Sequence, residues 1–214
     1  METVEIKLYK FSELSEEVKE KAINQYRENE YKHTPWFIDE VNQCFEKFAD
    51  IFSIEWRNID YEEPYRNDYH LTFDDNILNL TGQRLATYIW NNYKSDLFKH
   101  KYLKSFDGHK NHKRVKNYTA KRTGNKYCSY YSAIQLDNSC VLTGMCYDHN
   151  ILDPIYEFLN KPNDRIDFET LLNDCINSLC HAVSSEIEYQ YSDEAITETI
   201  EANDYDFTED GEMY

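Results

Sequence analysis

"DFETLLNDCINSLCHAVSSEIEYQY", residues 167–191, is the stretch that decides the fold. Its apolar side chains recur at intervals of three and four residues, which places them on a single face of an α-helix. The residues on that face are Phe168, Leu171, Leu172, Cys175, Ile176, Leu179, Ala182, Val183 and Ile187. The segment therefore predicts a long amphipathic helix, the clearest in the chain.

Segments on both sides of this helix show the same helical spacing. The predicted helices are 12–30 with Ser12 as N-cap, 34–52 with Thr34 as N-cap and Pro35 in the first turn, 80–98, 150–160 with Pro154 near its start, and 192–204 capped by Ser192. The predicted inner faces include Leu14, Val18, Ala22 and Tyr26, then Phe37, Val41, Phe45 and Phe48, and then Leu85, Ile89 and Tyr93.

Alternation of apolar and polar residues predicts strands in the remaining segments. Residues 4–11 read as one strand, and 53–59 and 67–73 as two more, with Pro64 in their connection. Residues 126–136 and 140–147 are rich in Tyr, Val, Ile and Cys and predict a hairpin around "DNS". The sum is a single α+β domain over residues 1–214, with about four strands in an antiparallel sheet packed by five or six helices.

The totals limit the class of protein. A length of 214 residues fits one domain, and the 19 Tyr, 11 Phe and 3 Trp predict that most of the chain folds. No run of about 18 apolar residues predicts a membrane span, and the N-terminus lacks the pattern of a signal peptide. We therefore expect an intracellular protein that does not bind membranes, whose six cysteines are thiols.

Charge is distributed very unevenly along the sequence. The net charge is −17, yet residues 99–126 hold ten Lys and Arg against one Asp. The remainder therefore carries −26, and the final 49 residues contain 14 acids and no Lys or Arg. Self-repulsion of this kind lowers folding stability, so a functional reason is worth seeking beside the alternative that excess acid only keeps the protein soluble.

Motifs for catalysis or cofactors are not found. Cys140, Cys146 and His149 could ligate a metal together with Cys175, Cys180 or His181, but no Cys-x-x-Cys pair is present. His109 and His112 lie three residues apart without nearby further ligands. There is no nucleophile elbow, phosphate loop or dinucleotide fingerprint, so we expect a protein without enzymatic activity, cofactor or metal.

The acidic C-terminal helix and tail, at about residues 186–214, form the first candidate site. Glu194, Glu198 and Glu201 line one side of the predicted helix, while Ile196 and Ile200 can face the body. Acids four residues apart on a helix lie about 6 Å apart, which is comparable to neighbouring phosphates on a DNA strand. The predicted partner-binding residues are Glu194, Glu198, Glu201, Asp204, Asp206, Glu209 and Asp210. The alternative is a solvated helix face with a polar tail.

The basic insertion at about 99–126 forms the second candidate site. Its Lys and Arg residues, interleaved with Tyr102, Phe106 and Tyr118, could follow a nucleic-acid backbone and stack on bases. The residues proposed for such contact are Lys113, Arg114, Lys116, Lys121 and Arg122. The alternative is an insertion loop that folds onto the acidic surface of the protein itself.

Two stretches resemble the two ends of a set of uncharacterised phage and prophage proteins from low-GC Gram-positive bacteria. They are "FSELSEEVKEKAINQYRE" (11–28) and "SDEAITETIEANDYDFTEDG" (192–211), about a fifth of the chain. Some of these relatives are labelled antirestriction or anti-CRISPR proteins. Many carry a Gly- and Trp-rich segment resembling "FSGFWSQGDGA", where this chain has "NIDYEEPYRNDYHLTFDDN" (58–76) without any Gly.

The resemblance implies a phage protein that acts in the cytoplasm of a bacterial host. Together with the acidic end, it predicts an inhibitor that binds a bacterial defence nuclease, foremost a CRISPR effector such as Cas9, and blocks its nucleic-acid binding or cleavage. Two alternatives from other classes stay open: a nucleic-acid-binding phage accessory protein that uses residues 99–126, and an enzyme with a metal site at Cys140, Cys146 and His149. The oligomeric state and the target are not set by the sequence.

Overall fold

The computed structural model describes residues 7–30, 35–102, 134–137, 140–144 and 146–214. The chain divides into two compact units. Unit 1 combines residues 1–38 with 184–214, and unit 2 is the continuous stretch 39–183. The two ends of the sequence therefore belong to one unit, and the middle of the sequence forms the other.

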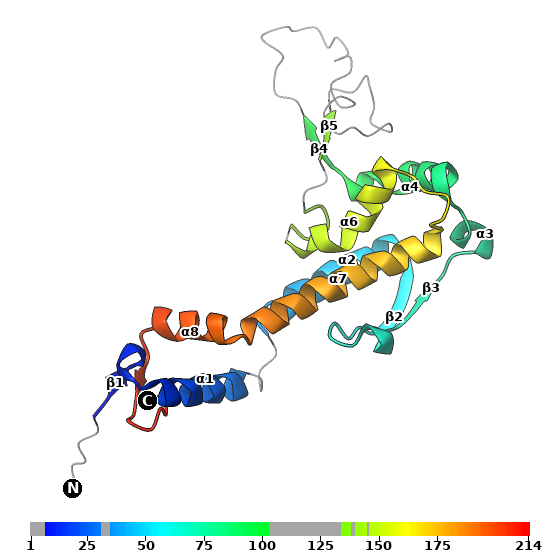
Figure 1. Ribbon diagram of the computed structural model, residues 1–214. Helices are drawn as coiled ribbons and strands as arrows, with labels where there is room; N and C mark the ends of the chain where they lie inside the picture. Colours follow the sequence, from blue (N-terminus) through cyan, green and yellow to red (C-terminus); the bar gives the residue numbers. More distant parts are fainter. Residues whose placement is uncertain (1–6, 31–34, 103–133, 138–139, 145) are drawn as a thin grey trace, which may run out of the picture. The chain divides into compact units, whose positions relative to one another are not determined.

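Unit 1 is built around two helices and one short strand pair. Its elements are β1 (Tyr9–Lys10), a 3-10 helix (Phe11–Glu13), α1 (Glu16–Glu30), the last turns of α7 (Phe168–Gln190), α8 (Asp193–Ala202) and β6 (Asp206–Phe207). β1 pairs antiparallel with β6, with Tyr9 opposite Phe207. Figure 1 shows α1 beside α8, with β1 next to the C-terminal end of the chain. Of the strand predicted at 4–11, only Tyr9 and Lys10 are strand among the residues described.

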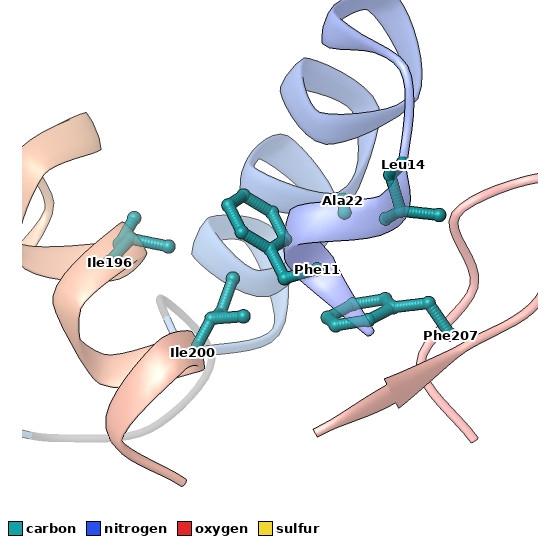
Figure 2. Close-up of a cluster of buried hydrophobic side chains, with 6 residues drawn as sticks. All are labelled: Phe11, Leu14, Ala22, Ile196, Ile200 and Phe207. Carbon is teal, nitrogen blue, oxygen red and sulfur yellow. The ribbon is translucent and has the colours of Figure 1, made fainter. Parts of the chain in front are cut away.

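A hydrophobic cluster joins the two sequence-distant parts of unit 1. Figure 2 shows its buried side chains, which are Phe11, Leu14, Ala22, Ile196, Ile200 and Phe207. The rings of Phe11 and Phe207 lie 5.8 Å apart between centroids. Val18 and Tyr26 pack against the cluster and are partly buried, which confirms the apolar face predicted for the first helix.

The start of α1 differs from the prediction. Ser12 lies in the 3-10 helix, and α1 begins four residues later at Glu16. The carbonyl oxygen of Ser15 accepts the first helical bond, from the N–H of Lys19 at 2.8 Å. The N-cap of α8 is confirmed, because the Oγ atom of Ser192 accepts a hydrogen bond from the N–H of Ala195 at 3.2 Å.

The tail after β6 packs closely on α1. Gly211 has a φ of +84°, a conformation that L-residues rarely adopt. A Cβ atom at Gly211 would lie 2.9 Å from Val18 Cγ1 and 3.0 Å from the Val18 carbonyl oxygen. Lys21 donates from Nζ to the carbonyl oxygen of Asp210 at 2.8 Å. The tail is therefore an integral part of unit 1.

Unit 2 contains most of the remaining elements. They are α2 (Ile38–Ile51), β2 (Ile54–Asn58), a 3-10 helix (Pro64–Arg66), β3 (Asp68–Leu71), α3 (Asp75–Leu78), α4 (Gly82–Leu97), β4 (Lys99–Tyr102), β5 (Ile134–Asp137), α6 (Tyr147–Asn160) and the first part of α7. β2 and β3 confirm the two strands predicted at 53–59 and 67–73 with Pro64 in their connection, and they pair antiparallel with each other. The predicted faces of α2, α4 and α7 are confirmed: all are buried except the partly buried Tyr93 and Ala182.

An aromatic cluster fills part of the core of unit 2. Phe52 lies 4.8 Å from Phe48 and 4.8 Å from Tyr93 between ring centroids. Phe168, at the start of α7, lies 6.2 Å from Phe52 and 5.1 Å from Phe73. The tilted and edge-on rings match the geometry that aromatic quadrupoles favour.

The hairpin predicted from residues 126–136 and 140–147 is wrong. β5 pairs instead with β4, Lys99 opposite Asp137, and residues 140–144 form bends that lead into α6. The reason is the fully buried carboxylate of Asp148 in the first turn of α6. It accepts hydrogen bonds from the N–H and the hydroxyl of Thr143, at 2.8 and 2.7 Å, and from the N–H of Gly144 at 2.9 Å.

The α+β class is confirmed, but the single sheet of about four strands is not. In the part of the chain that the structure describes, the strands form three separate antiparallel pairs, accompanied by seven α-helices. α6 also begins earlier than predicted, so that Pro154 lies in its interior. Because Pro154 has no N–H, the carbonyl of Asn150 lacks its helical donor; the hydroxyl of Ser178 donates to it at 2.8 Å instead.

Candidate protein interaction surface on unit 1

The negative charge of the protein is concentrated in unit 1. Its residues include 19 Asp and Glu against six Lys and Arg, a net charge of −13. Unit 2 includes 21 Asp and Glu against 17 Lys and Arg, a net charge of −4. Any surface that selects a partner by negative charge is therefore expected on unit 1.

Helix α8 presents the predicted acidic stripe. Glu194, Glu198 and Glu201 are exposed, while Ile196 and Ile200 are buried in the core, as the spacing predicted. Within the described parts of the chain, none of these three carboxylates forms an ion pair. Asp193 and Glu194 also lie in the first turn of α8, where the positive end of the helix dipole favours acids.

Lys10 pairs with two of the predicted partner-binding residues. Its Nζ atom lies 3.1 Å from the carboxylate of Asp204 and 2.9 Å from that of Asp206, and it donates to the Asp204 carbonyl at 2.7 Å. Both carboxylates raise the pKa of Lys10 above its usual value, and the hydrogen bond to Asp206 makes the largest contribution. Asp204 and Asp206 therefore have a cation partner within the protein, although the final 49 residues contain no Lys or Arg of their own. The antiparallel pairing of β1 with β6 supplies the cation, because Lys10 lies opposite Asp206.

Arg27 of α1 ties the start of α8 to the first helix. Its guanidinium group donates from Nε to the carbonyl oxygen of Tyr191 at 2.9 Å and from Nη1 to Oδ1 of Asn24 at 2.6 Å. It also forms an ion pair with Asp193. Arg27 and Lys10 were not singled out in the sequence because both pairings depend on the return of the distant C-terminal segment.

A groove of about 760 Å³ runs between α1 and α8 within unit 1. Carboxylates line it from both helices: Glu16, Glu17 and Glu20 from α1, and Asp193 and Glu201 from α8. Phe11 and Ile23 add apolar surface, and Lys19, Asn24, Arg27 and Thr197 complete the lining. The acids of α1 were not among the candidate site residues predicted from the sequence. Their closeness to the acids of α8 was not predicted.

The remaining acids of the predicted set lie in the turn after β6. Glu209 and Asp210 are exposed. The backbone of this turn is fixed by hydrogen bonds from the N–H of Gly211 to the Thr208 carbonyl at 3.0 Å and from the N–H of Thr208 to the Glu212 carbonyl at 2.9 Å. The structure therefore brings the acids of the tail and of α8 into one folded unit.

The alternative metal site receives no support. Within the described residues, no group of three His, Cys, Asp or Glu side chains is placed to hold a metal ion. Cys175 and Cys180 are buried, and burial raises the pKa of both thiols, whereas Cys146 is exposed. The Nε2 atom of His149 lies 3.7 Å from a carboxylate oxygen of Asp153.

The basic candidate residues Lys113, Arg114, Lys116, Lys121 and Arg122, like His109 and His112, lie outside the described residues.

No helix among the described residues is both long and apolar enough to cross a membrane. Comparisons of the chain with protein-family models, with curated proteins and with solved structures found no match.

Proposed function

We propose that this chain is a phage-encoded anti-defence protein that inhibits a bacterial nuclease by binding it in the host cytoplasm. The foremost target class is a CRISPR effector such as Cas9. The observation that carries the proposal is the exposed, unpaired stripe of Glu194, Glu198 and Glu201 on a unit with a net charge of −13. The resemblance of residues 11–28 and 192–211 to phage proteins adds the biological setting.

Inhibition requires only that the protein occupy a site built for nucleic acid. The channel of such a nuclease is lined by Lys and Arg that bind phosphates. Carboxylates about 6 Å apart along α8 offer those cations a comparable array of negative charge on a rigid helix. The field of unit 1 also accelerates encounter with a basic surface, and this acceleration weakens as salt rises.

The structure divides the predicted contact residues into two groups. Glu194, Glu198, Glu201, Glu209 and Asp210 are exposed and form no ion pair within the described residues. Asp204 and Asp206 already hold Lys10. The first group therefore forms the contact surface in this proposal, and Asp204 and Asp206 keep the β1–β6 pair together.

A cleavage assay with purified Cas9–guide complex and matched charge variants tests the proposal. The stripe variant changes Glu194, Glu198 and Glu201 to Gln. The control variant removes three exposed acids from unit 2 by Glu46→Gln, Asp50→Asn and Glu55→Gln. Inhibition should weaken in the stripe variant alone, and wild-type inhibition should fade as salt rises. Equal inhibition by wild type and a folded stripe variant would exclude α8 as the contact surface.

The ten Lys and Arg in residues 99–126 favour a second candidate, a nucleic-acid-binding accessory protein. In that case Lys113, Arg114, Lys116, Lys121 and Arg122 give the isolated protein affinity for DNA or RNA, with a steep salt dependence. Binding of labelled single- and double-stranded nucleic acid is measured at two salt concentrations, for the wild type and for a variant with these five residues changed to Ser. Micromolar binding that the variant loses would favour this candidate over the inhibitor.

A further inference from the structure

The groove between α1 and α8 differs from a typical small-molecule site. Its volume of about 760 Å³ falls in the range of ligand pockets, but such pockets are lined mainly by apolar side chains. Here five carboxylates line the two walls. Carboxylates from two helices, together with the apolar side chains of Phe11 and Ile23 in the same lining, suit the two faces of an amphipathic helix.

The charge in the groove is only partly compensated within the protein. Lys19 forms an ion pair with Glu16 at 2.8 Å, and Arg27 pairs with Asp193. Glu17, Glu20 and Glu201 line the same groove, are exposed, and form no ion pair within the described residues. The groove therefore presents three uncompensated negative charges, contributed by both of its helices.

The apolar part of the groove sets the second requirement for an occupant. Ile23 is half-buried, and Phe11, which is buried, also belongs to the groove lining. An occupant with only cations would leave this surface uncovered, whereas a helix with apolar residues one turn from its cations would cover it.

We propose that the groove is a docking site for a basic amphipathic helix of a partner protein. Lys or Arg side chains of that helix pair with Glu17, Glu20 and Glu201, and an apolar side chain covers Ile23. The inference rests on the proposed function in that the partner is a basic protein. It goes further by assigning the contact to a helix in this groove, beside the exposed stripe of α8.

The experiment uses the full chain and a fluorescent synthetic helix of about 14 residues, with Lys and Leu spaced three and four apart. The groove variant changes Glu17 and Glu20 to Gln. The matched control changes Glu194 and Glu198 to Gln, which removes the same charge outside the groove. We expect the groove variant to weaken peptide binding at least tenfold and the control to change it less than threefold, with both variants retaining the wild-type circular dichroism spectrum.

Two results would overturn the inference: equal weakening by both variants, which indicates attraction to net charge alone, or no binding to the wild type at low salt. The nuclease assay keeps this test separate from that of the proposed function. Peptide binding in the groove by a protein that inhibits no nuclease would contradict the proposed function only. Inhibition that depends on Glu194 and Glu198 but not on Glu17 and Glu20 would contradict the groove only.

Discussion

Replacing Phe207 by Ala should strongly destabilise unit 1 while leaving unit 2 folded. Phe207 is 1% exposed and packs against Phe11 in the cluster that joins α1 to α8. Truncation of a buried Phe to Ala costs about 3–5 kcal/mol, which includes the lost ring contact and the cavity. The 69 residues of unit 1 are expected to supply about 3–10 kcal/mol in total at typical stability per residue. The substitution therefore removes a large share of the stability of this unit.

Hydrogen exchange followed by mass spectrometry measures this effect. Amides of α1 should exchange much faster in Phe207→Ala than in the wild type, whereas amides of α4 in unit 2 should be unchanged. Tyr214→Ala is the control, because Tyr214 is 74% exposed and also belongs to the C-terminal tail. Wild-type protection of α1 in Phe207→Ala would refute the reasoning, since the tail would then not be part of the core.

Three further predictions concern the backbone, the thiols and the pH dependence. Gly211→Ala should lower the melting temperature of unit 1, because the left-handed φ and the contact with Val18 both disfavour a Cβ; an unchanged melting curve would contradict the close packing of the tail. Cys146 should react with a thiol reagent in the native protein while Cys44 and Cys175 stay protected until urea is added, as peptide mapping would show. Burial raises the pKa of Cys44 and Cys175, so the folded state keeps protons that the unfolded state loses above about pH 9. The free energy of unfolding of unit 2 should therefore fall as pH rises from 8 to 10; identical urea midpoints at the two values would disprove this.

Helical faces were predictable because their signal is local. The spacing of Leu171, Cys175 and Leu179 determines which side of α7 is buried, whatever partner covers it. The partner of β5 was not predictable in the same way, because strand pairing is set by distant residues. Residues 140–147 have strand-like composition, but the buried carboxylate of Asp148 holds residues 140–144 in bends. No pattern in the sequence marks that carboxylate as buried.

The same distinction between local and long-range signals applies to the candidate site. The stripe of Glu194, Glu198 and Glu201 follows from helical periodicity within ten residues, so the sequence revealed it. The groove combines α1 with α8 and requires knowledge that the two chain ends pack together. The sequence revealed the acid excess of the C-terminal end, but not that Glu16, Glu17 and Glu20 of α1 lie beside it.

The joining of both ends in unit 1 has a consequence for synthesis on the ribosome. Tyr9 can pair with Phe207 in the β1–β6 pair only after Phe207 has been synthesised, 198 residues later. At elongation rates of about 5–20 residues per second, α1 emerges roughly 10–40 s before the strand and helix that cover it. Unit 2, a continuous stretch, can fold during this interval and shorten the loop that remains to be closed. During this interval the acids along α1 favour the solubility of a helix whose apolar face is still uncovered.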